Sequence, residues 1–209
     1  GGESRKLHTL RENKKNLCGD VVSKAIAYAV GVLEVNASMG LIVAAPTAGS
    51  SGVIPGVCCS LQENYGFTDE EICKVLFNAA AVGYLITRNA TTAGAEGGCQ
   101  AEVGAASAMA AAALVDIRGG TAEQCAEAFA MALTNLEGLV CDPVAGLVEI
   151  PCIKRNVIGA MNAVSAADQL IYLVLPFAAE GAYRLLSVLV FRHTVASFFL
   201  AVCPISDAQ

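Results

Sequence analysis

Apolar residues recur at the spacing of an α-helix in several segments of the chain, and glycine, proline or capping residues separate these segments. The first segment is Gly19–Ala37, and Asp20 is its expected N-cap. Its apolar positions at helical spacing are Val22, Ile26, Ala29, Val30 and Leu33. No stretch alternates strictly between apolar and polar residues over the length of a strand, so the pattern predicts an all-α fold.

Capping residues mark the starts of two further helices. Thr68 and, three residues later, Glu71 form a capping box ahead of an apolar run through Leu85. A second capping box, of the same Thr-x-x-Gln/Glu type, opens a predicted helix over residues 121–136. Both boxes are local signals, so we expect both helices independently of how the chain packs.

Alanine dominates Gln100–Ile117, where helix propensity is close to its maximum, and Gly119 and Gly120 end this segment. A long helix is also predicted over Ile153–Leu173. The intervening loops, rich in Gly, Pro and small hydroxyl residues, are Met39–Gly56, Thr91–Gly98 and Cys141–Pro151. We therefore expect a compact bundle of Ala-rich buried helices whose Gly- and Pro-rich loops form the functional site.

Length and charge narrow the classes of function. A chain of 209 residues is long enough to bury one sizeable core. With 13 basic against 19 acidic residues it has no basic surface of the kind that nucleic acid requires. The mean hydropathy of +0.57 owes much to alanine, which indicates closely packed helices rather than lipid contact. The polar start, Gly1–Asn16, shows no secretory signal, so we expect a cytoplasmic protein.

Nine cysteines without a secretory context favour free thiols over a disulfide framework. Three of them stand at junctions between loops and helices, where a helix N-terminus favours the thiolate that a metal needs: Cys99, Cys141 and Cys152. Their spacing is that of neither zinc nor ferredoxin sites, so spacing alone leaves ligands and buried thiols equally open. The interpretation as small buried hydrophobes is preferred for Cys18, Cys58, Cys59, Cys73 and Cys125.

Three long motifs resemble the iron–sulfur L-serine dehydratase family, in its alpha-type domain. They are GLVCDPVAGLVEIPCIKRN at 138–156, GAEGGCQAEVGAASAM at 94–109 and AAPTAGSSGVIPG at 44–56, and they follow the family's order. The similarity covers about Gly1–Asp168 and includes NASMG at 36–40.

The resemblance implies that Cys99, Cys141 and Cys152 hold a [4Fe-4S] cluster with one iron open to substrate. An open iron acts as a Lewis acid toward the carboxylate and hydroxyl of L-serine. The implied activity is that of a lyase, which dehydrates and deaminates L-serine to pyruvate and ammonia.

Residues 47–52 (TAGSSG) offer hydroxyl groups and backbone amides ahead of a helix, a geometry suited to binding a carboxylate. By resemblance, substrate binding is assigned to Thr47, Ser50 and Ser51. Their residue types alone favour a plain helix cap, so both roles stay open.

Charged residues beside the three cysteines have two interpretations. The acidic ones either relay protons or cap helices, with capping preferred: Glu96, Glu102 and Glu149. Lys154 and Arg155 either neutralise an anionic cluster and substrate or form ordinary surface charge.

The general base of the elimination is not identified in this sequence. His8 lies in the polar start and His193 lies outside the region of resemblance, and we interpret both as structural or solvated. Family members carry residues ahead of the position of Gly1, and the resemblance places a basic residue there. The catalytic base is therefore expected outside this chain.

The resemblance divides the chain at Asp168. Residues 1–168 form the expected cluster-binding domain, incomplete at its N-terminus, and 169–209 form a divergent apolar tail. Arg192 and His193 in the middle of this tail oppose a membrane span, and Cys203 within it is not counted as a ligand.

Two alternatives accompany the lyase: a cluster-binding subunit or fragment that needs a partner chain, and a membrane-associated helical protein suggested only by the tail and the hydropathy. The expected partners are L-serine, a beta subunit or upstream regulatory domain, and further copies of the same chain. Neither nucleic acid nor a membrane is expected.

Overall fold

The structure, a computed structural model, describes residues 1–144 and 149–172, without the side chain of Glu149. No β-strand occurs in this part of the chain, so the predicted all-α class is confirmed. The elements are α1 (Glu3–Glu12), α2 (Asp20–Ala37), η1 (Ala48–Ser50), α3 (Val53–Tyr65), α4 (Asp69–Asn89), α5 (Gly94–Cys99), η2 (Gln100–Gly104), α6 (Ala105–Ile117), α7 (Ala122–Thr134) and α8 (Glu149–Tyr172).

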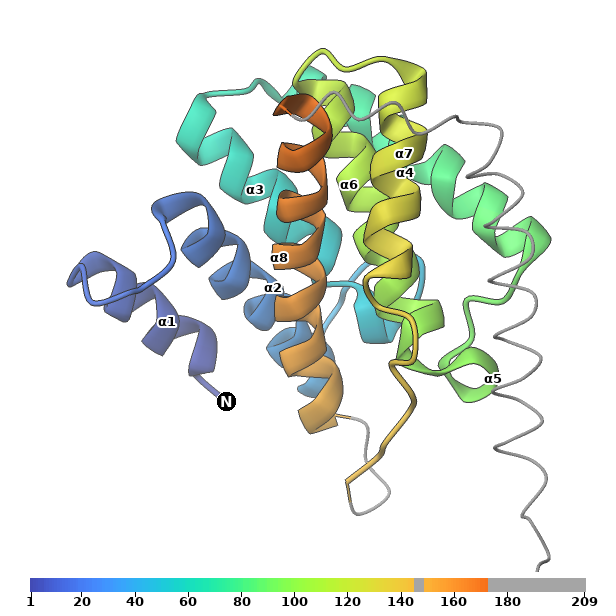
Figure 1. Cartoon of the computed structure of the whole chain (residues 1–209). Helices are drawn as coiled ribbons and strands as arrows, with labels where there is room; N and C mark the ends of the chain where they lie inside the picture. Colours follow the sequence, from blue (N-terminus) through green and yellow to red (C-terminus); the bar gives the residue numbers. More distant parts are fainter. Residues whose placement is uncertain (145–148, 173–209) are drawn as a thin grey trace, which may run out of the picture.

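Helix α6 is the centre of the bundle, with α4, α7 and α8 packed around it (Figure 1). Every residue from Ala105 to Val115 is buried. Because most of these side chains are methyl groups, neighbouring helices approach α6 from several sides. The predicted helix over Gln100–Ile117 thus exists, but its first turn is the π-helix η2 rather than an α-helix.

Among the described residues, Gly94–Ile117 is a helical stretch long and apolar enough to cross a membrane. Its most apolar window is 78% buried inside the molecule, as is typical of a core helix.

Both capping boxes are confirmed. The Glu71 amide donates to Thr68 Oγ1 at 3.3 Å, and the Thr68 amide donates back to the Glu71 carboxylate at 2.8 Å. The Thr121 and Gln124 pair at the start of α7 has the same two hydrogen bonds. The stop after α6 is confirmed as well, because Gly119 adopts a positive φ of 81° there.

Several predicted boundaries were wrong. The loop over Met39–Gly56 ends earlier, because α3 begins at Val53. The loop over Thr91–Gly98 contains α5, whose first turn forms on the carbonyl of Ala93. The long C-terminal helix begins at Glu149, since a proline such as Pro151 is tolerated in a helix's first turn.

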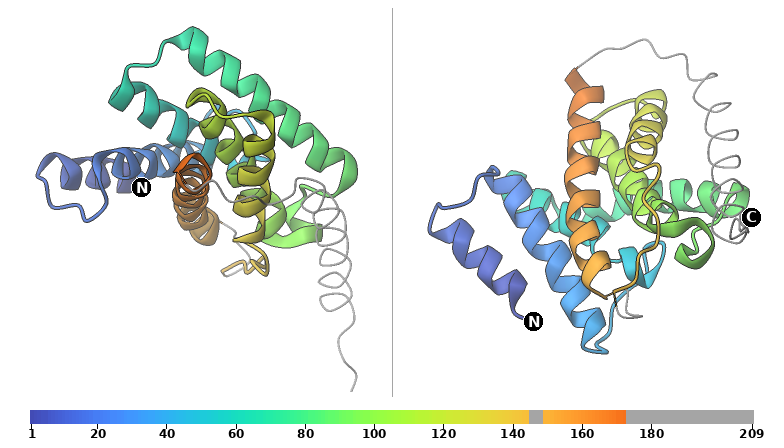
Figure 2. Two further views of the ribbon diagram at one scale, coloured as in Figure 1. Left: turned by 45° about the horizontal axis from the view of Figure 1, so that its top comes forward. Right: turned by 60° about the horizontal axis from the view of Figure 1, so that its bottom comes forward.

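The polar start is helical, which the sequence pattern did not predict. Helix α1 has no buried residue, so no apolar face announced it. It lies beside α2 at one edge of the molecule (Figure 2).

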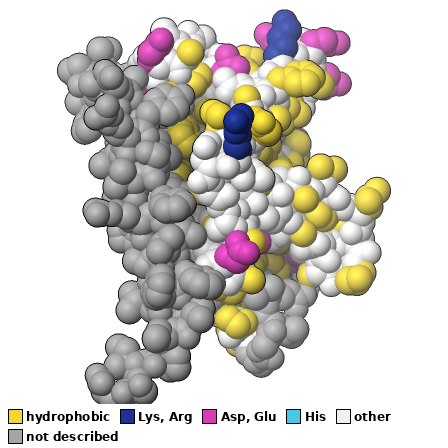
Figure 3. All heavy atoms as spheres, turned by 90° about the vertical axis from the view of Figure 1, so that its right-hand side faces the viewer, with side chains coloured by type: hydrophobic (Ala, Val, Ile, Leu, Met, Phe, Trp, Pro, Cys, Tyr) yellow, Lys and Arg dark blue, Asp and Glu magenta, His cyan; other side chains and the backbone are white. Residues whose placement is uncertain are grey.

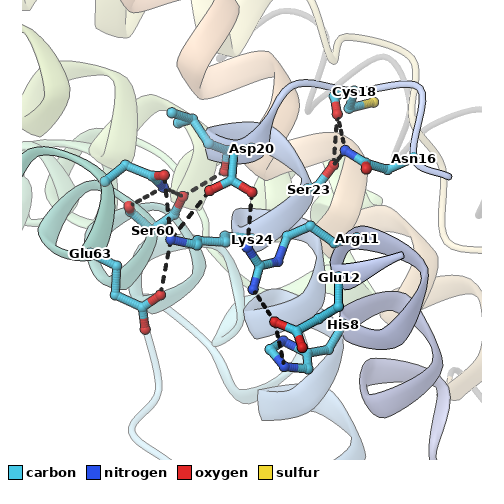
Figure 4. A network of polar contacts seen from close by, with 12 residues as sticks. His8, Arg11, Glu12, Asn16, Cys18, Asp20, Ser23, Lys24, Ser60 and Glu63 are labelled. Atoms are coloured by element: carbon cyan, nitrogen blue, oxygen red, sulfur yellow. Dashed lines mark hydrogen bonds and ion pairs between the residues drawn. The ribbon is translucent and has the colours of Figure 1, made fainter. Parts of the chain in front are cut away.

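An ion-pair network holds α1 to α2 and α3 (Figure 4). Arg11 Nη1 lies 2.9 Å from Asp20 Oδ1, and Lys24 Nζ lies 3.3 Å from both Asp20 Oδ2 and Glu63 Oε2. The prediction that Asp20 is the N-cap of α2 was therefore wrong: Gly19 occupies that position, and the Asp20 carboxylate binds Arg11 and Lys24 instead.

Glycine permits a close approach between α3 and α2. A Cβ at Gly56 of α3 would lie 2.7 Å from the carbonyl oxygen of Ala25 and 3.1 Å from the Ala29 methyl group, both on α2. This contact brings the start of α3 against α2. The segment directly before α3, residues 47–52, is the hydroxyl-rich loop, and it is brought against α2 as well.

On the described part of the face shown in Figure 3, charged side chains are few. Separately, α4 exposes a row of large apolar residues to solvent: Leu76, Phe77, Tyr84 and Leu85. Large apolar side chains exposed on one helix are typical of contact surfaces.

Candidate metal centre

Cys99 lies at a sharp turn between α5 and η2. Gly98 before it has a φ of 73°, and a Cβ there would lie 2.9 Å from the carbonyl oxygen of Leu139. The Gln100 amide donates to that same carbonyl at 2.8 Å. Only glycine allows the turn and the close approach together, so the loop that carries Cys141 runs directly beside Cys99.

Helix α8 brings Cys152 to the same place. The sulfur atoms of Cys99 and Cys152 and the carboxylate of Glu102 all lie within 4.8 Å of one another. Cys99 is 1% exposed and Cys152 is 5% exposed. Two of the three cysteines that the sequence singled out are therefore adjacent, although 53 positions of the numbering, from 99 to 152, separate them.

Cys141 lies outside this group. It is exposed on the neighbouring loop, and its backbone amide would be 3.2 Å from a Cβ placed on Gly98. The third expected ligand is thus an exposed residue next to the pair in the fold.

Arg155 connects the pair to the Cys141 loop. Its Nη1 donates to Cys99 Sγ at 2.9 Å and to the Val140 carbonyl at 2.8 Å, and its Nη2 lies 2.5 Å from Asp142 Oδ1. Of the two basic residues beside the cysteines, Arg155 is therefore the one that compensates negative charge at the sulfur atoms. Lys154 is exposed and lines a separate cavity of about 710 Å³ with residues of α1 and α2.

The thiols differ in pKa. The thiol of Cys152 and the guanidinium of Arg155 both favour the Cys99 thiolate, and they lower the pKa of Cys99 to about 6. The same contact with Cys99, followed by burial, raises the pKa of Cys152. Burial and the nearby Cys99 raise the pKa of Cys141. The pKa of Cys99 is thus lowered by its neighbours Cys152 and Arg155, whereas the sequence pattern predicted that a helix N-terminus would lower it.

A buried asparagine that the sequence did not assign to the site ties it together. Asn156 is 0% exposed, and its Oδ1 accepts from the Gly52 amide at 3.0 Å. Its Nδ2 donates to the carbonyls of Gly49 and Cys152, each at 2.7 Å. Asn156 therefore fixes the hydroxyl-rich loop to the turn of α8 that carries Cys152. The available signal was an amide four residues after Cys152, one helical turn further along α8.

The hydroxyl groups of that loop bond mainly to the loop itself. Ser50 is 0% exposed, and its Oγ lies 3.2 Å from the Ala45 carbonyl and 3.1 Å from Thr47 Oγ1. Ser51 is 1% exposed and donates to the Ala48 carbonyl at 2.8 Å. Thr47 is less buried and is the N-cap of η1. These bonds match the capping role, and substrate contact by the three residues stays a prediction.

The comparisons with known proteins agree on one family. Residues 1–172 match the family model described as serine dehydratase alpha chain. The chain belongs to this family.

Its relatives include the probable L-serine dehydratase, alpha chain, of Bacillus subtilis (strain 168), which is 54% identical over 168 residues, 80% of this chain and 56% of that protein. The probable alpha chain of Latilactobacillus sakei is 54% identical over 149 residues, 71% of each chain. The alpha chain of Peptoniphilus asaccharolyticus is 50% identical over 167 residues, 80% of this chain and 57% of that protein. The chain spans just over half the length of the Bacillus and Peptoniphilus relatives.

The remaining candidate residues of this member of the serine dehydratase alpha chain family lie away from the cysteine pair or outside the described residues. Glu96 is exposed and accepts from the Thr91 hydroxyl at 2.7 Å, a bond to a side chain rather than to a backbone amide of α5. His8 is on α1, with a side chain 58% exposed, 3.6 Å from Glu12. Outside the described residues lie the Glu149 side chain, His193 and Cys203.

Of the cysteines interpreted as buried hydrophobes, Cys58 and Cys125 are buried. Cys18 and Cys59 are partly buried. The interpretation was wrong for Cys73, which is exposed on α4 because it lies on the face opposite Val75 and Ala79.

Proposed function

We propose that this chain is the cluster-binding part of an L-serine dehydratase, a lyase that converts L-serine to pyruvate and ammonia. The observation that carries the proposal is the buried pair of Cys99 and Cys152, contacted by Arg155, in a chain of the serine dehydratase alpha chain family. The Bacillus and Peptoniphilus relatives bear the name L-serine dehydratase, alpha chain.

The residues fit an iron–sulfur cluster in their chemistry. Thiolates are the ligands that such clusters require, and three thiols from α5, the 138–144 loop and α8 occur in one region. Cys99, Cys141 and Cys152 would hold a [4Fe-4S] cluster, which when bound supplies a Lewis-acidic iron for the hydroxyl and carboxylate of serine.

The protein's own groups have separate tasks in this proposal. Arg155 offsets negative charge at Cys99 and holds the Cys141 loop in place. Asn156 keeps the hydroxyl-rich loop against the cysteine pair, where Thr47, Ser50 and Ser51 would orient the substrate. Loss of water from L-serine leaves aminoacrylate, which tautomerises and hydrolyses to pyruvate and ammonia.

We further propose that the protein works in the cytoplasm with a beta chain, as the relatives' name alpha chain suggests. The exposed apolar row on α4 supports assembly with a further copy of the chain. With either partner, the proposed catalytic base lies in a segment or subunit outside the described residues.

The test is pyruvate formation from L-serine after anaerobic reconstitution with iron and sulfide, with the beta chain of a relative present. We expect pyruvate and ammonia in equal amounts, and no product from D-serine. A fully loaded protein that forms no pyruvate with the beta chain present would contradict the proposed function.

A further inference from the structure

Glu102 occupies a position that the cysteine chemistry does not explain. It lies on the π-helical turn η2, three residues after Cys99, and its carboxylate is part of the group within 4.8 Å that includes the Cys99 and Cys152 sulfur atoms. The wider turn directs the side chain toward the sulfur atoms. The side chain is partly buried, so its carboxylate keeps access from solution.

Two glycines leave room for this carboxylate. A Cβ on Gly94 would lie 2.5 Å from Glu102 Oε2, and a Cβ on Gly49 would lie 3.1 Å from the same atom. Gly49 belongs to the hydroxyl-rich loop and Gly94 to the start of α5. The carboxylate thus lies between the cysteine pair and the loop assigned to substrate, against the backbone of Gly49 and Gly94.

Among the described residues, the Glu102 carboxylate receives no hydrogen bond and forms no ion pair. The nearby guanidinium of Arg155 is directed at Cys99, Val140 and Asp142 instead. The neighbouring Glu96, by contrast, accepts a hydrogen bond from Thr91. A partly buried carboxylate beside sulfur atoms that become anionic on binding metal is stabilised by a cation supplied from outside.

We propose that Glu102 binds the α-ammonium group of the amino-acid substrate. This inference rests on the proposed function and names the part of the substrate that the three thiols and the hydroxyl loop leave unmatched. The carboxylate and hydroxyl of serine have iron and the loop as partners, whereas its ammonium needs an anionic acceptor. A charge-assisted hydrogen bond from ammonium to carboxylate fits the side chain that lies between them.

The experiment compares two ligands that differ only in the amino group, L-serine and 3-hydroxypropionate. Binding to the cluster-loaded full chain is measured by calorimetry, together with iron content and visible absorption. In Glu102→Gln, affinity for L-serine should fall about ten- to hundredfold, the usual effect of losing a hydrogen bond between charged groups. Affinity for 3-hydroxypropionate should stay the same or rise. Glu96→Gln, the matched control, should bind both ligands like the unmodified chain.

Three results would overturn the inference. Unchanged affinity of Glu102→Gln for L-serine would exclude an ammonium contact. Equal loss for both ligands, or loss of iron and visible absorption, would make Glu102 a structural residue or a metal ligand. An unmodified loaded chain that binds neither ligand would overturn the proposed function itself, and the inference with it.

Discussion

The sulfur atom of Cys99 has both a thiol and a guanidinium as neighbours, while the buried thiols of Cys58 and Cys125 lie in the apolar core. This difference separates ligand candidates from core residues. Cys99→Ala, Cys141→Ala or Cys152→Ala should abolish the brown colour and visible absorption after anaerobic reconstitution. Cys58→Ala and Cys125→Ala should keep both, although a core cavity lowers their stability. Equal loss of absorption in the two sets would refute the ligand assignment.

The metal-free protein should show the unusual acidity of Cys99 directly. Because its pKa is lowered to about 6, it should be a thiolate at neutral pH, where an ordinary cysteine with a pKa of about 8.5 is still protonated. The ultraviolet absorbance of thiolate, followed against pH, should therefore show a first step near pH 6.

In Cys99→Ser this step should disappear, and in Arg155→Met it should move to higher pH, since the cation that stabilises the thiolate is gone. A first step near 8.5 in the unmodified protein would contradict the contacts of Cys99 with Cys152 and Arg155.

At the scale of elements, the site depends on one residue of α8 that holds η1 and α3. Asn156 makes three hydrogen bonds in a place without solvent. Asn156→Ala leaves the Gly52 amide and the Gly49 carbonyl without their partner, which should lower the free energy of unfolding by roughly 1–3 kcal/mol.

Urea denaturation of the metal-free protein measures this change. The exposed Asn89, which donates only to Leu85 in its own helix, provides the control: Asn89→Ala should stay within about 0.5 kcal/mol of the unmodified chain. Equal effects of the two substitutions would mean that Asn156 does not join the elements.

For the whole molecule, we expect that the chain alone binds L-serine without converting it rapidly to pyruvate. The described residues supply thiols, a guanidinium and a hydroxyl-rich loop, but no described histidine belongs to the cysteine group, and Lys154 lines a separate cavity. The loaded chain alone should therefore bind L-serine and change its visible spectrum, yet form little pyruvate. Addition of a relative's beta chain should raise turnover by the factor of about 10²–10⁴ typical of a general base. Rapid turnover by the chain alone would place the base within it.

Local signals made part of this fold predictable. The two capping boxes, the alanine run of α6 and the glycine stop at Gly119 depend on residues within one helical turn, so they hold in any fold that contains these helices. Loop limits were less accurate because α5 and the start of α8 form in segments rich in Gly and Pro, where propensity argues against helix.

The amino-acid sequence by itself determined the all-α class, the family and the choice of three cysteines, because periodicity, caps and long motifs need no knowledge of the packing. Tertiary structure alone decided which groups meet. The bond from Arg155 to Cys99 spans 56 residues, and that from Asn156 to Gly49 spans 107. Helix α1 likewise docks through ion pairs to other helices, without an apolar face of its own. Contacts at such separations depend on how helices cross, which the small side chains of α6 permit but no local pattern specifies.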